Sequence, residues 1–216
     1  MTDKPYIQVK GVGHIKKSPD TIIVNMKIDA TDLDYKKAVD SAEKELNGVR
    51  NNLKAIGFTK KDLKTRDFNI NSVYNEKRNS HGEYESVFAG YRVSHRLSLS
   101  FPLDMKKLDG VISKLSISLA NPGIDIAFAI SDVERAKKDI LESATKDALE
   151  KATILCKASN VKLGRLLSIN HSWHEISFES SDSFMLSEGG ASGNCFDFEP
   201  DDIDASDTVE FTWEIE

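Results

Sequence analysis

A chain of 216 residues with 39% hydrophobic and 30% charged side chains has the composition of a folded globular protein, which excludes a disordered chain. Its two cysteines, Cys156 and Cys195, are far apart in the sequence and exclude a scaffold held by disulfides. The net charge of −6 is unevenly divided, because residues 1–165 carry 29 basic and 22 acidic side chains, whereas residues 166–216 carry 13 acidic and no basic ones.

The first two predicted elements are strands. Apolar residues or glycines occupy alternate positions at Ile7, Val9, Gly11 and Gly13, and after a turn at Pro19 the alternation resumes at Ile22, Val24, Met26, Ile28 and Ala30. Alternation on both sides of a proline turn predicts a β-hairpin.

A helix follows the second strand. Its apolar positions recur at steps of three and four residues, at Tyr35, Ala38, Ala42, Leu46, Val49, Leu53 and Ile56. Either Asp32 or Asp34 is suited to cap its first turn, since a short carboxylate accepts the unpaired backbone N–H groups there. Gly57 is suited to end the helix in a left-handed conformation.

The next two strands enclose a polar loop. One strand is predicted from Phe68 to Tyr74, and the turn-rich segment 75–85 forms the loop. The returning strand places alternate residues on one face, namely Tyr91, Val93, His95, Leu97, Leu99 and Phe101. A shorter helix over 104–116 and a strand over 124–130 follow.

The longest helix is predicted from Ser131 to about Ser159. Ser131 and Glu134 have the spacing of a capping box, and a stripe of alanines favours close packing of the helix on its neighbour. A strand from Leu167 to Trp173 comes next, then an acidic loop rich in Ser and Gly, and a closing strand over 209–215.

The order of elements is therefore ββα-ββα-βα-ββ. Most strands alternate rather than being apolar on both faces, which is typical of an antiparallel sheet with one solvated face. We predict an α+β fold, a mostly antiparallel sheet with about three helices packed on it. Residues 1–216 are predicted to form a single domain with a flexible acidic loop at about 179–202.

The sequence does not predict an active site. Gly11-Val12-Gly13 lies inside a strand, whereas a phosphate-binding loop needs glycines that open a helix. His171 and His174 would point to opposite faces of a strand, and no third ligand accompanies them at zinc-like spacing. His95 falls on an apolar strand face, which favours a hydrogen-bonded core histidine. We therefore expect no enzymatic activity, no catalytic residue and no cofactor.

An acidic run is a weak candidate for a cation site. Five carboxylates occur within eight residues, at Asp197, Glu199, Asp201, Asp202 and Asp204. Hard cations such as Ca²⁺ bind clustered oxygens, but the EF-hand pattern with its central Gly and distal Glu is missing. A solvated acidic loop is the favoured interpretation.

Four aromatic residues flank the predicted hairpin loop, at Tyr74, Tyr84, Phe88 and Tyr91. Core packing explains some of them, but aromatic side chains around a polar loop also suit a protein–protein contact. We take these four residues as candidate interaction residues.

The compartment and the partners are constrained by what the sequence lacks. The first residues contain no apolar signal core, and no apolar run approaches the ~20 residues that cross a bilayer. A cytoplasmic protein without a membrane span is predicted, the alternative being an exported protein whose signal has been removed. Basic residues are scattered rather than clustered, so we expect no nucleic-acid partner.

Several segments, taken in order, resemble the SIMPL-domain family, a domain of unknown function. They are Gly11-Val12-Gly13 with Pro19-Asp20, the helix end at 53–57, the hairpin from Tyr74 to Tyr91, the helix positions Ala144, Asp147-Ala148 and Lys151-Ala152, and the segment 161–164. The resemblance covers nearly the whole chain and extends to bacterial oxidative-stress defence proteins and periplasmic immunogenic proteins. It implies an α+β fold, high-order homo-oligomers in some bacterial members, and no established catalytic residue.

The sequence thus favours a bacterial, non-enzymatic assembly or interaction protein, with a stress-related role implied by the resemblance. It would act through homo-oligomerisation, and an unknown protein partner is a further possibility. The acidic segment is expected to fold against the basic body of its own or a neighbouring chain, so that high salt would weaken the assembly. The alternative is a small-molecule or divalent-cation binding protein that uses the acidic C-terminal loop.

Overall fold

The computed structural model describes residues 5–78, 83–118, 123–172, 176–180, 184–186 and 199–216. These residues form three helices and two antiparallel sheets, which confirms the predicted α+β class. The chain divides into two compact units. Unit 1 comprises 1–19, 129–180 and 200–216, and unit 2 comprises 20–128 and 181–199. The prediction that they act as a single domain stays a prediction.

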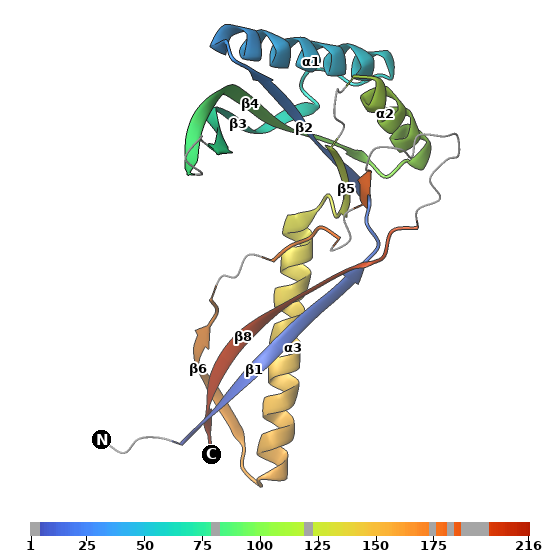
Figure 1. Ribbon diagram of the computed structural model, residues 1–216. Coiled ribbons are helices and arrows are strands. Elements are labelled where there is room, and N and C mark those ends of the chain that lie inside the picture. The colour runs from blue at the N-terminus through green and yellow to red at the C-terminus, as the bar shows by residue number, and fades with distance from the viewer. Residues whose placement is uncertain (1–4, 79–82, 119–122, 173–175, 181–183, 187–198) are drawn as a thin grey trace. The chain divides into compact units, whose positions relative to one another are not determined.

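The elements follow one another much as predicted (Figure 1). In chain order they are β1 (Tyr6–Lys17), β2 (Thr21–Asp32), α1 (Tyr35–Ala55), β3 (Leu63–Arg78), β4 (Tyr84–Pro102), α2 (Met105–Ser118), β5 (Gly123–Ala129), α3 (Val133–Ala158), β6 (Leu163–Asn170), β7 (Phe184–Leu186) and β8 (Ile203–Ile215).

Unit 2 is a two-layer structure. Its five-stranded sheet has the order β3-β4-β2-β5-β7, and α1 and α2 cover one face (Figure 1). The register of β2 on β4 runs from Thr21 opposite Pro102 to Asp32 opposite Tyr91. Even-numbered residues of β2 and odd-numbered residues of β4 form the core together with the helices, and the other face of these two strands carries mainly polar residues. One solvated face is what alternating strands predict.

The first helix begins and ends as its sequence predicts. Asp34 is the N-cap, and its carboxylate accepts the N–H of Lys37 at 3.0 Å. Gly57 adopts a left-handed φ of 91° and donates to the carbonyl of Lys54. A glycine in this conformation costs little, whereas other residues would be strained.

Unit 1 is also two-layered. Its sheet has the order β1-β8-β6, and α3 runs alongside β1 and β8 (Figure 1). The helix lies so close to β1 that a Cβ atom on Gly11 would be 2.0 Å from the carbonyl oxygen of Ala144, and one on Gly13 would be 2.0 Å from that of Ile140. The Gly-Val-Gly segment is therefore a packing site for an alanine-lined helix.

The outer edge of β1 is occupied by two side chains of α3. The carboxylate of Asp147 accepts the backbone N–H of Val12 at 2.7 Å, and Lys151 donates to the carbonyl of Lys10 at 3.4 Å. Lys151 also bonds Asp147 at 2.7 Å. The pair satisfies one backbone donor and one acceptor that another strand would otherwise take, which protects an exposed sheet edge.

Two local predictions are wrong. The predicted hairpin does not form, because β1 pairs with β8 whereas β2 pairs with β4. The N-cap of α3 is Asp132, which accepts the N–H of Arg135, rather than Ser131 of the expected capping box. The short strand β7, which pairs with β5, lies within the predicted flexible loop at 179–202, and the flexibility of this loop stays a prediction. Most of the remaining predicted loop lies outside the described residues.

Part of the acidic segment folds against the basic body of the same chain. Strand β8 lies between β1 and β6, and its register places Glu210 opposite Lys10 and Asp204 opposite Lys16. Opposite charges on neighbouring strands attract. The uneven charge of the sequence is therefore partly balanced within unit 1.

Candidate interaction surface

The ends of β3 and β4 form a two-stranded ribbon beyond the rest of their sheet. Strand β2 ends at Asp32 opposite Tyr91, while β3 and β4 stay paired as far as Arg78 and Tyr84. We call residues 73–78 and 84–90 the arm. All of its side chains except those of 73, 89 and 90 are exposed, and an isolated two-stranded ribbon is at best marginally stable in water.

A bulge places two aromatic residues of β4 on one face. Val73 lies opposite Gly90 but Tyr74 lies opposite Phe88, so Ala89 is an extra residue in the strand. Gly90 has a φ of 128°, and a Cβ there would be 2.6 Å from the carbonyl oxygen of Asp32. The extra residue brings Phe88 to the face that carries Tyr91, since side chains otherwise alternate.

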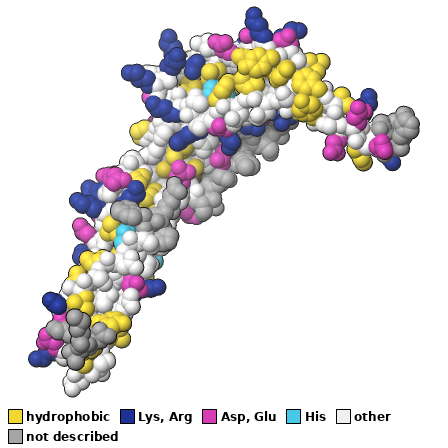
Figure 2. All heavy atoms as spheres, turned by 90° about the vertical axis from the view of Figure 1, so that its left-hand side faces the viewer, with side chains coloured by type: hydrophobic (Ala, Val, Ile, Leu, Met, Phe, Trp, Pro, Cys, Tyr) yellow, Lys and Arg dark blue, Asp and Glu magenta, His cyan; other side chains and the backbone are white. Residues whose placement is uncertain are grey.

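Four aromatic rings are stacked edge to face at the base of the arm. The distances between ring centroids are 5.5 Å for Tyr35 and Tyr91, 5.3 Å for Tyr91 and Phe88, and 5.7 Å for Phe88 and Tyr74. We call these four residues the aromatic ladder. Tyr35, Phe88 and Tyr74 are 53%, 40% and 58% exposed. Figure 2 shows hydrophobic side chains gathered where the ribbon leaves the unit.

The ladder contains three of the four predicted interaction residues. Tyr84 stands apart at the far end of the arm, 75% exposed and opposite Arg78. Tyr35 was missed, because the sequence pattern assigns it to the buried stripe of α1. Its place as the first helical residue, after the exposed Leu33, is the only signal that it lies at the rim of the core.

His95 is a core residue. It is 7% exposed, its Nε2 lies 2.9 Å from the hydroxyl of Thr65, and the ring of Phe68 packs edge-on against it. Burial lowers the pKa of His95, and the nearby charge of Arg50 lowers it further. A buried, hydrogen-bonded imidazole of this kind confirms the predicted structural role.

The prediction that His171 and His174 point to opposite faces of one strand is tested only in part. Nε2 of His171 lies 2.7 Å from a carboxylate oxygen of Asp207, which is 9% exposed. Asp207 also accepts the N–H of Thr208. His171 follows β6 rather than lying within it, and His174 lies outside the described residues. The contact joins the end of β6 to β8.

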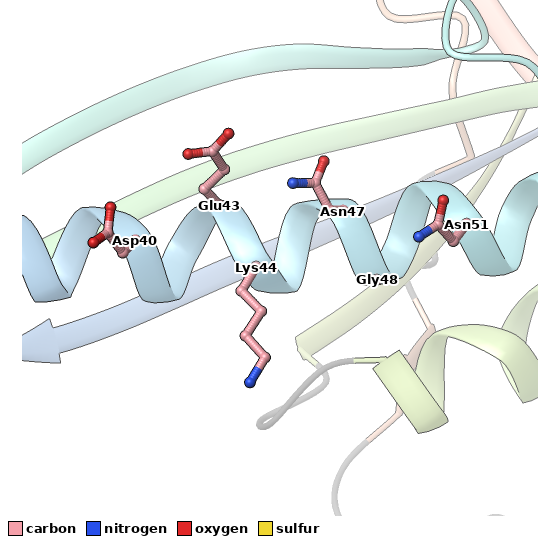
Figure 3. A pocket seen from close by; sticks show the side chains of 6 residues that line it. All are labelled: Asp40, Glu43, Lys44, Asn47, Gly48 and Asn51. Atoms are coloured by element: carbon pink, nitrogen blue, oxygen red, sulfur yellow. The ribbon is translucent and has the colours of Figure 1, made fainter.

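A hollow on α1 offers no enclosed site. It is lined by Asp40, Glu43, Lys44, Asn47, Gly48 and Asn51, which all belong to one helix (Figure 3). Gly48 lacks a side chain, so its neighbours surround an open gap on the helix surface. Among the described residues, only α1 lines this hollow, so a ligand there would stay in contact with solvent.

The acidic candidates do not converge in the part of the chain that the structure describes. Asp202 accepts the hydroxyl of Ser18 at 2.6 Å and lies 3.9 Å from the ammonium of Lys16. Within the described ranges, no group of three His, Cys, Asp or Glu side chains is placed to hold a metal ion. Asp197 lies outside these ranges, and Glu199 and Asp201 are exposed. The cation site stays an untested prediction.

Comparison with known proteins adds a family and two relatives. The profile of the SIMPL family, described as a protein of unknown function (DUF541), matches residues 7–213. The chain is 25% identical over 171 residues to the 26 kDa periplasmic immunogenic protein of Brucella melitensis, covering 79% of this chain and 68% of that protein. The same named protein of Brucella abortus is 24% identical over the same shares. None of the described helices is long and apolar enough to span a membrane.

Proposed function

Since the chain belongs to the SIMPL family, whose function is unknown, we propose that it is a non-enzymatic assembly protein that acts through homo-oligomerisation. The aromatic ladder is the contact surface. The observation that carries this proposal is the solvent exposure of aromatic rings that pack edge to face at the base of the arm. The arm extends beyond the strands that flank the rest of the sheet. Exposed aromatic residues are enriched in protein interfaces because they bury much area with few rotatable bonds.

The contact is expected to be mainly apolar. Several acidic residues of the C-terminal segment already face basic groups of their own unit: Arg165 lies 2.9 Å from Glu214, and Lys16 lies 3.9 Å from Asp202. Fewer opposite charges are therefore left for a neighbouring copy. We therefore expect an assembly that persists at high salt, in place of the salt-sensitive assembly that the sequence favours. The reason is that salt screens exposed charges but does not weaken the burial of apolar surface.

Light scattering of the purified chain tests the proposal. We expect an oligomer in the wild type and a monomer when Tyr74 and Phe88 are both replaced by Ser. Ile117→Ser is the matched control, because Ile117 is 76% exposed on α2 of the same unit but lies outside the ladder. The control should keep the wild-type mass. A wild-type monomer at every protein and salt concentration would refute the proposal.

The relatives favour export over the predicted cytoplasmic location. Both are named periplasmic proteins, and we extend this compartment to the present chain as part of the proposal. Osmotic-shock fractionation of the native cells, followed by immunoblotting, should recover the protein with periplasmic markers. Recovery with cytoplasmic markers alone would restore the original prediction. The stress-related role stays a prediction.

A further inference from the structure

The outer edge of β3 is a long strand edge with no strand beside it among the described residues. Strand β3 is the last in the order β3-β4-β2-β5-β7, so only its inner edge is paired (Figure 1). It is 16 residues long, whereas the edge strands β6 and β7 have eight and three. The edge of β1 is occupied by Asp147 and Lys151 of α3. An open strand edge presents unpaired N–H and C=O groups, which the backbone of another strand satisfies.

Three side chains give this edge an apolar border on the side of the sheet that the helices cover. Ile70 lies opposite the core residue Val93, so residues two and four positions away from Ile70 share its face. Phe68 and Tyr74 are two of these, and they are 50% and 58% exposed. Ile70 itself is half-buried. A strand placed beside β3 would cover apolar side chains as well as backbone groups.

The charges of β3 make the strand complementary to an antiparallel copy of itself. If Ile70 of one copy lies opposite Ile70 of the next, Lys64 comes opposite Glu76 at both ends of the contact. The bulge near the start of β3 displaces this pair by one position, which a long lysine side chain spans. A slip by two residues keeps the helix-covered faces together. In one direction it sets Lys64 against the basic residues 77–78, and in the other it moves Lys64 away from Glu76.

The same register gives the arm the third strand that it lacks. Residues 73–78 of one copy would lie beside residues 62–67 of the other, and the two-fold symmetry repeats this at the opposite end. The ring of Tyr74, a member of the aromatic ladder, then comes close to the exposed guanidinium of Arg66 in the second copy. Arginine and aromatic rings attract each other. Because a two-stranded ribbon is marginal in water and three strands are not, the contact would stabilise the arm.

We propose that β3 pairs antiparallel with β3 of a second copy of this chain, about a two-fold axis at Ile70, so that two five-stranded sheets become one. This inference rests on the proposed function and adds to it the strand edge that joins two copies. Backbone hydrogen bonds and apolar contacts provide the affinity, and the ion pairs fix the register. The contact is isologous, since both copies use the same residues.

A charge exchange tests the antiparallel register. Lys64→Glu and Glu76→Lys should each weaken the association of two copies about tenfold, because each reverses two exposed ion pairs per dimer. An equimolar mixture of the two variants should associate as tightly as the wild type, since each copy then carries the charge that the other needs. Lys44→Glu, at an exposed position of α1, is the matched control and should match the wild type. Sedimentation equilibrium at low ionic strength measures the association, and circular dichroism establishes that each variant is folded.

Cysteine cross-linking locates the two-fold axis. Ile70→Cys, in a chain that also carries Cys195→Ser, should form a disulfide-linked dimer on mild oxidation, because only a residue on the axis meets its own copy. The remaining Cys156 is 3% exposed. Ser72→Cys in the same background is the matched control and should stay unlinked, since it would lie opposite Phe68 of the second copy.

Two outcomes would overturn the inference while leaving the proposed function in place. One is an oligomeric wild type whose two charge variants remain as weak when mixed as when separate, or are not weakened at all. The other is a Ser72→Cys variant that cross-links as readily as Ile70→Cys. A wild type that is monomeric at every concentration would instead reject the proposed function, and the inference with it.

Discussion

At the scale of single residues, the close packing of α3 explains why β1 has glycines at two positions. Gly11 and Gly13 face the backbone of α3 across a gap that admits no Cβ atom, and Ala144 and Ala148 line the other side. The Gly-Val-Gly segment and the alanines of α3, which carry the family resemblance, are thus two halves of one contact. Their role in packing leaves no reason to assign them a ligand.

Gly13→Ala should destabilise the protein by at least about 2 kcal/mol, because an added Cβ would lie 2.0 Å from the carbonyl oxygen of Ile140 and force the helix away. Urea unfolding followed by circular dichroism measures the change. Gly48→Ala is the matched control, since nothing lies within 4 Å of a Cβ at that helical position. It should stabilise by about 0.5–1 kcal/mol. Equal effects of the two substitutions would contradict this account.

Some residue roles could be predicted because one strand or one turn determines them. The position of His95 on an apolar strand face was enough to predict burial, and Gly57 followed from the end of a helical stripe. The N-cap of α3 could not be fixed in this way. Ser131 and Asp132 are both good caps, and the backbone path from β5 into the helix decides between them.

At the scale of elements, the edge of β1 shows side chains replacing a strand. The N–H of Val12 and the carbonyl of Lys10 point away from β8 and meet Asp147 and Lys151 instead. Hydrogen bonds from Lys151 and from the Val12 backbone lower the pKa of Asp147, and the positive charge of Lys151 adds to this. A carboxyl group with a lowered pKa stabilises the fold above its ordinary pKa, and this contribution is lost as the pH falls through the folded-state value.

Asp147→Asn should therefore make the free energy of unfolding less dependent on pH in the acid range. We expect the wild type to lose stability steadily as the pH falls from about 5 towards 2, and the variant to be less stable at pH 7 but to lose less over that range. Urea unfolding at several pH values provides the measurement. Asp40→Asn, on the exposed side of α1, is the control and should parallel the wild type. Parallel curves for Asp147→Asn would show that the carboxylate does not support the edge.

The pairing of the strands was harder to predict than their existence. Alternation identified β1 and β2, but it does not specify partners, and the turn at Pro19 links two units instead of closing a hairpin. The bulge at Ala89 was also invisible, because an extra residue only shifts the alternation by one position. Three ladder residues were nevertheless found, since they cluster around a polar segment.

At the scale of the whole molecule, the two units differ in how the chain builds them. Among the described residues, the core of unit 2 comes from positions between Ile22 and Phe128, whereas unit 1 combines three separate segments. No pattern in the sequence indicates this division. Helices and strands alternate along the chain in one regular order, and only the long-range pairing of β1 with β8 separates the units.

A fragment of residues 20–128 should fold alone, because it contains every described residue of the unit 2 core and, of the described strands of that unit, lacks only β7. We expect cooperative thermal unfolding and dispersed amide resonances in a two-dimensional NMR spectrum. The complementary deletion, which joins residues 1–19 to 129–216, is the comparison. A fragment without a cooperative transition would mean that unit 2 depends on the remainder of the chain.

The position of β8 has a consequence for biosynthesis. The central strand of its sheet follows β1 at a long distance in the chain, so β1 lacks this partner until residues 203–215 emerge from the ribosome. At the usual 5–20 residues per second, that wait is about 10–40 s. A nascent chain therefore carries β1 without β8 throughout this interval. Premature termination before β8 would leave β1 and β6 without a common neighbour, and such truncated products are natural clients for chaperones and proteases.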